Sequence, residues 1–81
     1  MEIFYTPHFK RSFKSLPKTI KKKLGKQTDF LLKNLRHPSL KSKKYNEKRK
    51  IWQVRIDRNY RFYFLVKKDK YILLEIESHP K

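Results

Sequence analysis

Two arginines and a histidine in the second half of the chain could together act on a phosphodiester bond. Arg55, Arg61 and His79 are predicted to share one face of a β-sheet. The planar fork of arginine binds two phosphate oxygens at once, and histidine can exchange protons near neutral pH. Cleavage of RNA by its own 2′-hydroxyl needs a base, cations on the phosphate and an acid. The lack of cysteine and of a carboxylate cluster argues against a metal nuclease, and we expect no cofactor.

A predicted β-hairpin positions the two arginines. Apolar and polar residues alternate along 51–56 and again along 60–64, which is typical of two strands that are each buried on one face. A three-residue loop that ends with Asn59 in the left-handed conformation would join them. This register sets Arg55 directly opposite Arg61, on the face away from the apolar side chains. Because like charges in that arrangement destabilise a sheet, the pair indicates an anionic ligand.

Two glutamates offer a structural explanation for the same face. The last predicted strand runs from residue 71 to about residue 78, with Ile72, Leu74 and Ile76 on its apolar side, so Glu75 and Glu77 share the open face with the arginines. Cross-strand salt bridges between the glutamates and the arginines would then account for both pairs. From spacing alone, a basic nucleic-acid-binding module is therefore favoured over a nuclease.

The remaining periodicity predicts a strand and two helices. Residues 2–6 have strand composition, and Thr6 followed by proline begins a short helix. A second helix is expected from residue 17 to about residue 35, with an apolar stripe along one side. Gly25 inside it suggests that the two helices pack closely. The expected fold is α+β: an N-terminal strand, a two-helix hairpin, and a three-stranded antiparallel sheet covered on one face by the helices.

Residues 38–50 are predicted to be the least ordered part of the chain. They lack periodicity and carry six cations against one carboxylate, Glu47. One interpretation is a flexible basic linker. The other is a cationic loop that follows a phosphate backbone, with Tyr45 as its one aromatic side chain.

Composition points to one small domain with a polyanionic partner. The 81 residues suffice for a single domain spanning 1–81, and 23 Lys and Arg against seven Asp and Glu give a formal net charge of +16. Such an imbalance favours nucleic acid as a partner. The absence of cysteine suits a reducing compartment, and there is neither a signal peptide nor an apolar run long enough to span a membrane. We therefore expect a cytoplasmic protein that does not contact membranes.

The hairpin and the C-terminal residues resemble the RelE/ParE family of bacterial toxins. The resemblance rests on Trp52-x-x-Arg55-Ile56-x-x-x-Tyr60-Arg61-Phe62-x-Phe64 and on the ending Ile76-Glu77-Ser78-His79-Pro80-Lys81. It extends over nearly the whole chain, including the Thr6-Pro7-x-Phe9 opening. In the RelE branch it implies a metal-independent endoribonuclease that cleaves mRNA on the ribosome by 2′-hydroxyl attack.

The resemblance also implies roles for individual residues. Arg61 would stabilise the transition state with Arg55 beside it, and His79 would transfer protons. The candidate RNA-binding residues are Lys43, Lys44, Lys48, Arg49, Lys50 and Arg58. Some relatives use a carboxylate before the tryptophan as general base, which makes Glu47 the candidate. Where some relatives end in tyrosine after the histidine, this chain has Pro80.

The family further implies a partner and two alternative functions. Its members are neutralised by a cognate antitoxin, often with an acidic segment, and commonly bind operator DNA jointly with it. The ParE branch has the same fold but inhibits DNA gyrase. A third possibility is a non-catalytic relative whose cations hold nucleic acid or an acidic protein.

Overall fold

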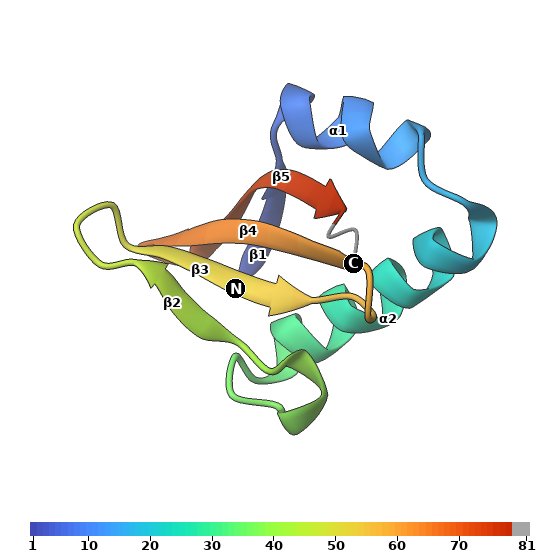
Figure 1. The fold of residues 1–81 in the computed structure, drawn as a ribbon. Helices are drawn as coiled ribbons and strands as arrows, with labels where there is room; N and C mark the ends of the chain where they lie inside the picture. Colours follow the sequence, from blue (N-terminus) through green and yellow to red (C-terminus); the bar gives the residue numbers. More distant parts are fainter. Residues whose placement is uncertain (79–81) are drawn as a thin grey trace.

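One mixed sheet with two helices against it makes up residues 1–78, the part of the chain that the computed structural model describes (Figure 1). The elements in order are β1 (Glu2–Tyr5), α1 (Pro7–Lys14), α2 (Lys18–Lys33), the short 3-10 helix η1 (Pro38–Leu40), β2 (Lys43–Asn46), β3 (Ile51–Arg55), β4 (Tyr60–Lys67) and β5 (Lys70–Ser78). The strand order is β1-β5-β4-β3-β2, with β1 parallel to β5 and the other pairs antiparallel. The predicted α+β class is confirmed, and the sheet gains β1 and β2 at its two edges.

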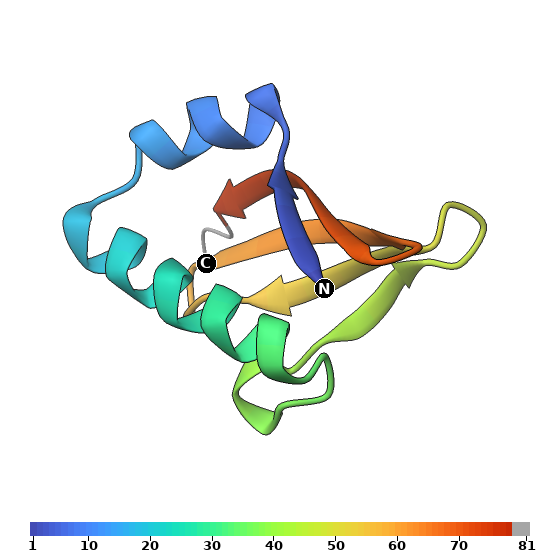
Figure 2. The ribbon, with the colours of Figure 1, turned by 180° about the vertical axis from the view of Figure 1, so that it is seen from behind.

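The core lies between the helices and one face of the sheet. Phe9 of α1 and Leu24 and Leu31 of α2 are buried against Phe62 and Phe64 of β4. Figure 2 shows α2 in front of the sheet and α1 above it. The apolar stripe predicted for the second helix is thus confirmed. This arrangement leaves the opposite face of the sheet free of helices.

Gly25 does not mark a close contact between the helices, so that prediction is wrong. It is exposed, and a Cβ atom added there would meet nothing within 4 Å. The two helices diverge, and a groove of about 480 Å³ lies between them, lined by residues of both. Helix α2 also ends at Lys33, two residues earlier than predicted, because Asn34 adopts an extended backbone with φ −166° and ψ 114°.

The hairpin has the predicted register but a different turn. Val54 pairs with Phe62 and Arg55 with Arg61, as expected. Asn59, however, has no positive φ. The Asp57 carboxylate closes the turn instead, because its Oδ1 accepts hydrogen bonds from the backbone N–H groups of Asn59 at 2.8 Å and of the next residue at 2.9 Å.

Residues 38–50 are more regular than predicted. Leu40 of η1 is fully buried, and β2 pairs with β3 along its length. The buried Gln27 of α2 ties this segment down, since its Nε2 donates to the carbonyl oxygens of Ser39 at 2.9 Å and Arg55 at 2.6 Å. The prediction failed because β2 is an edge strand with mostly exposed side chains, which leaves no hydrophobic alternation to detect.

A β-bulge in β5 changes which residues face the core. Tyr63 pairs with Glu75 while the next residue, Phe64, pairs with Leu73, so Leu74 is the extra residue. The predicted alternation is therefore wrong before the bulge, where Tyr71 and Leu73 face the core in place of Ile72 and Leu74. After the bulge it holds, and Glu75 and Glu77 occupy the open face as expected.

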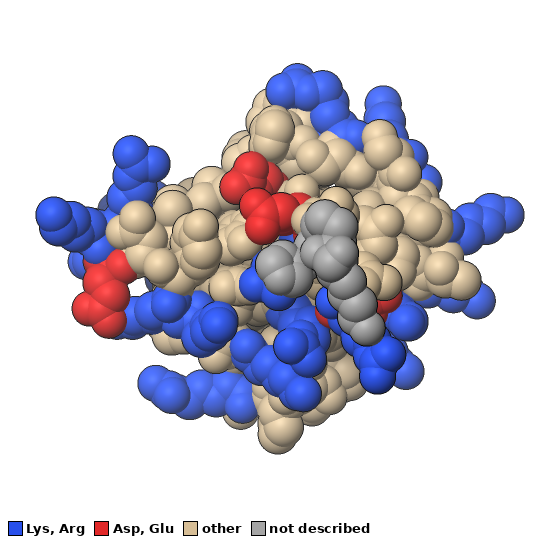
Figure 3. Space-filling model, viewed as in Figure 1, with Lys and Arg blue, Asp and Glu red and all other residues tan. Residues whose placement is uncertain are grey.

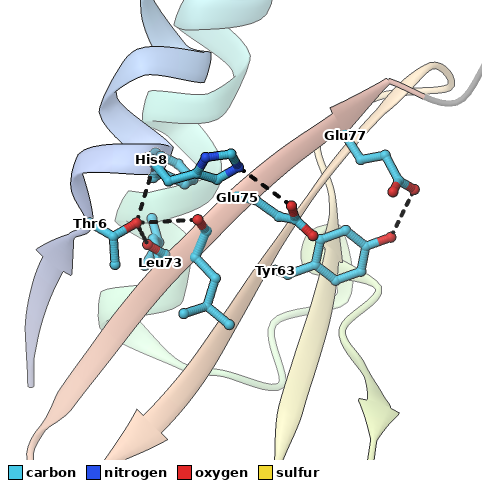
Figure 4. A network of polar contacts seen from close by, with 8 residues as sticks. Thr6, His8, Tyr63, Leu73, Glu75 and Glu77 are labelled. Carbon is cyan, nitrogen blue, oxygen red and sulfur yellow. Dashed lines mark hydrogen bonds and ion pairs between the residues drawn. The ribbon is translucent and has the colours of Figure 1, made fainter.

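Thr6 fastens the bulge to the start of α1. Its Oγ1 donates to the carbonyl oxygens of Leu73 and Leu74, at 2.8 and 3.2 Å (Figure 4). The same oxygen accepts a hydrogen bond from the backbone N–H of Phe9 at 3.2 Å, and so caps the helix that begins at Pro7, as predicted. One hydroxyl therefore positions both the start of α1 and the bulge of β5.

Candidate nucleic-acid interface

A cationic cavity lies on the open face, over β2, β3 and β4. It measures about 230 Å³ and is lined by Lys41, Lys43, Gln53, Arg55 and Arg61. The strand register brings these side chains together. Lys43 of β2 pairs with Gln53 of β3, and this pair lies next to the pair of Arg55 and Arg61 on β3 and β4. Figure 3 shows lysine and arginine side chains gathered over this half of the face and acidic ones beside β5. Within residues 1–78, four cations and no carboxylate line the cavity, which suits a phosphate group.

The direction of the Arg61 side chain is set by Gln53. With its amide oxygen turned toward Arg61, Gln53 accepts from Nη1 at 2.5 Å and from Nε at 3.1 Å. Gln53 is buried, so it holds the guanidinium without exposing a competing group. Because the amide is neutral, Arg61 keeps its full positive charge for a ligand. The neighbouring Arg55 is exposed, and its carbonyl oxygen is held by Gln27.

The glutamates of β5 do not neutralise the two arginines. In the described part of the chain, the ion pairs join Lys23 to Asp57 at 3.7 Å and His8 to Glu75 at 3.6 Å. Glu77 instead accepts a hydrogen bond from the Tyr63 hydroxyl. The alternative of cross-strand salt bridges on this face is therefore wrong.

Tyr63 lies on the open face, as its alternation in the sequence predicts, but it was not among the predicted site residues. Its hydroxyl donates to Oε1 of Glu77 at 3.1 Å (Figure 4), and the Tyr45 ring lies 4.8 Å from its own, centroid to centroid. Burial, followed by the hydrogen bond to Glu77, raises the pKa of Tyr63 to about 12. Strand parity could have identified it, because Tyr63 follows Arg61 by two residues along β4 and therefore lies on the same face.

The structure brings only some of the predicted RNA-binding residues to the cavity. Lys43 lines it, as does Lys41, which the prediction did not include. Lys44 points elsewhere, with its Nζ 5.8 Å from the centre of the Trp52 ring. Arg58 is exposed in the β3–β4 turn, next to the arginine pair.

A second basic group lies at the other end of β3. The turn between β2 and β3 carries Lys48, Arg49 and Lys50, together with Glu47. With about 3.4 Å per strand residue, this end of β3 is roughly 14 Å from Arg55. Glu47, the candidate general base, is therefore not brought together with Arg61. His79 lies outside the described residues.

The described residues contain neither a metal-binding cluster nor a helix that could span a membrane. Within residues 1–78, no group of three or more His, Asp or Glu side chains is placed to hold a metal ion. In the same range, every helix is too short or too polar to cross a membrane.

Solved structures of toxins share this fold over almost the whole chain. The YoeB/ParE toxin from Agrobacterium tumefaciens superposes with a TM-score of 0.83 at 13% identity, over 99% of this chain and 100% of that one. The archaeal RelE–RelB complex from Pyrococcus horikoshii OT3 gives 0.83 at 14% identity, over 99% and 96%. The YoeB–YefM toxin–antitoxin complex from Staphylococcus aureus gives 0.79 at 17% identity, over 96% and 95%. No protein-family model and no curated protein sequence matches the chain. The predicted RelE/ParE-type fold is confirmed.

Proposed function

We propose that this protein is the toxin of a toxin–antitoxin pair and a metal-independent endoribonuclease that cleaves mRNA on the ribosome. The observation that carries the proposal is the cavity of four cations, on a fold shared end to end with YoeB and RelE toxins. A cavity without a carboxylate lining fits an anion, and two of its cations are arginines directly opposite each other.

In the proposed reaction the cavity holds the scissile phosphate. Arg61 and Arg55 bind its non-bridging oxygens, where negative charge grows as the 2′-oxygen attacks. Gln53 keeps Arg61 oriented, so little reorganisation is needed as that charge develops. His79 is the candidate for protonating the leaving 5′-oxygen. The basic turn with Lys48, Arg49 and Lys50, together with Arg58 and Lys44, supplies RNA contacts outside the cavity.

The same charge distribution supports an acidic antitoxin as partner. With a net charge of +16, the chain favours a protein segment that brings carboxylates. The solved structures with this fold include a RelE–RelB complex and a YoeB–YefM toxin–antitoxin complex, which supports an antitoxin as partner. Operator DNA would be bound only jointly with the antitoxin.

The Arg61→Ala variant tests the proposal. Added to a translation reaction, the wild-type protein should cut mRNA within codons at the ribosome, and its expression should arrest bacterial growth. Arg61→Ala should lower the cleavage rate by about 10²–10³-fold, because a group that stabilises transition-state charge is lost. Arg11→Ala, an equal loss of charge on the exposed surface of α1, is the matched control and should cleave normally.

Three results would contradict the proposal, each in a different way. Growth arrest with intact mRNA and stalled replication would identify a gyrase inhibitor. Unaffected growth with no cleavage would identify a non-catalytic binding module. A folded Arg61→Ala variant that cleaves at the wild-type rate would exclude Arg61 from the mechanism.

A further inference from the structure

Glu77 and Arg61 lie directly opposite each other and yet are turned apart. They are a register pair of β5 and β4, and the Cβ atoms of such a pair are about 5 Å apart. At that separation a salt bridge would be the ordinary outcome. Instead Arg61 reaches toward β3, to Gln53, while Glu77 accepts from Tyr63. A carboxylate and a guanidinium therefore stand side by side on the open face, each held by a neutral partner.

The position of Glu77 depends on a fixed donor. Tyr63 is buried to 4% exposure and is packed against the ring of Tyr45, so its hydroxyl has little freedom. That hydroxyl engages Oε1 of Glu77. Glu75, two residues earlier on the same face, pairs with the exposed His8 of α1 instead (Figure 4). The two glutamates share strand, face and charge, but only Glu77 is opposite the phosphate-binding arginine.

We propose that Glu77 is the general base that takes the proton from the 2′-hydroxyl. This inference rests on the proposed nuclease function. The 2′-oxygen and the 3′-phosphate belong to neighbouring carbons of one ribose, so the base and the phosphate-binding cation must also be neighbours. The cross-strand pair of Glu77 and Arg61 meets that condition, whereas Glu47, at the far end of β3, does not.

The proposed step is an internal transesterification of the RNA. The 2′-hydroxyl gives its proton to the Glu77 carboxylate, and the 2′-oxygen forms a bond to phosphorus. The bond from phosphorus to the 5′-oxygen breaks, and that oxygen takes a proton from His79. The products are a 2′,3′-cyclic phosphate on one fragment and a 5′-hydroxyl on the other. Tyr63 keeps its proton throughout and acts as a positioning residue.

Several charged or titratable groups surround Glu77. Arg61 lies opposite on β4 and Tyr63 next along that strand, with Tyr45 of β2 behind it. On its own strand Glu75 is the nearest acid, and α1 contributes His8 next to that residue. Of these groups, Glu77 is the carboxylate in register with Arg61.

The experiment compares Glu77→Gln with Glu75→Gln as a matched control. Single-turnover cleavage of mRNA on programmed ribosomes is measured from pH 5 to 9, together with the half-saturating protein concentration. Glu77→Gln should slow cleavage by about 10²–10⁴-fold, the usual contribution of a general base. It should leave the half-saturating concentration unchanged, because Glu77 is proposed to act on the proton and not to bind the RNA. Glu75→Gln should keep the wild-type rate and profile.

The Tyr63→Phe variant tests whether Tyr63 acts on cleavage through Glu77 and not only on the stability of the fold. It removes the donor that positions Glu77, so cleavage should slow while the half-saturating concentration stays that of the wild type. Thermal unfolding of each variant shows that it is folded. If Glu77→Gln cleaves at the wild-type rate with the wild-type profile, the assignment of Glu77 fails and the nuclease stands. If wild-type protein cuts no mRNA, the proposed function fails and this inference fails with it.

Discussion

At the scale of single residues, two buried glutamines organise the cationic cavity without adding charge. Gln53 directs the Arg61 side chain, and Gln27 holds the carbonyl oxygen of Arg55 from the other side of the sheet. A carboxylate at residue 53 would form an ion pair with Arg61 and weaken its attraction for a phosphate. Neutral amides therefore position these groups and leave their charge available.

The raised pKa of Tyr63 predicts a pH dependence of stability. The pKa rises from 10.0 to about 12 on folding, so the folded state holds this proton more tightly. The resulting stabilisation is fully present below about pH 10 and is lost as pH rises through about 12. Relative to Tyr63→Phe, the wild-type free energy of unfolding should be higher by about 1 kcal/mol at neutral pH, because of the hydrogen bond to Glu77. That advantage should fall between pH 10 and 12.

Urea denaturation of both proteins across this range provides the measurement. Taking the difference between the two removes the contribution of the many lysines, which also titrate there. A difference that stays constant up to pH 12 would show that the hydrogen bond to Glu77 does not hold the proton.

Sequence alone gave the arginine pair but not its supports. Period-two alternation and loop length were enough to place Arg55 opposite Arg61, because a one-residue slip would bury charge. Alternation places Gln53 on the same face as Arg55, but it does not predict that Gln53 is buried, since polar residues in alternation normally face solvent. Gln53 is covered by the Arg61 side chain and by the neighbouring strand β2. No local sequence pattern predicts β2, so the burial of Gln53 could not be predicted either.

At the scale of elements, Gly25 weakens α2 without a packing reason. It lies inside the helix, has no positive φ, and leaves open space where a Cβ would be. Gly25→Ala should therefore raise the free energy of unfolding by about 1 kcal/mol, from helix propensity alone. The midpoint of urea unfolding should increase with an unchanged slope.

Truncation of the preceding residue, Leu24, should have the opposite effect on stability. Leu24 is 2% exposed, so Leu24→Ala should cost about 2–5 kcal/mol in the same assay. If Gly25→Ala destabilised the protein instead, α1 would have to approach α2 more closely than the structure shows.

Strand β5 marks the limit of prediction at this scale. Tyr71, Ile72, Leu73 and Leu74 are four consecutive apolar residues, which fit either register of alternation equally well. The choice is made by Thr6, whose hydroxyl bonds the carbonyl oxygens at the bulge from far away in the sequence. The core-facing side of α2, by contrast, could be predicted from the regular apolar stripe of that helix alone.

At the scale of the whole molecule, the net charge of +16 should make RNA binding strongly dependent on salt. Each phosphate contact on single-stranded nucleic acid contributes about −0.7 to the slope of log affinity against log salt. The four cavity cations therefore predict a slope of about −3 or steeper.

Fluorescence anisotropy with a labelled RNA that carries 2′-deoxyribose at the cleavage position measures this slope. Lys43→Ala should reduce its magnitude by about 0.7. Lys14→Ala, on the last turn of α1, removes the same charge away from the cavity and should have little effect. Equal effects of the two variants would indicate that RNA responds to net charge and not to the cavity.

The fold class followed from local patterns, but the order of strands did not. Two amphipathic helices and three alternating strands were enough to predict helices on one face. The pairing of β1 with β5 joins residues 68 positions apart, from Glu2 with Lys70 to Tyr5 with Leu73, and no local signal reports contacts of that length.

That pairing of the first and last strands also sets when the molecule can be completed. During synthesis β1 leaves the ribosome before its partner β5, which follows it by 68 residues in register. The strands that carry the cationic cavity, β2, β3 and β4, therefore lack their flanking strand until β5 has also emerged. In a protein proposed to attack translating ribosomes, this order of assembly keeps the sheet incomplete while β2, β3 and β4 are already outside the ribosome.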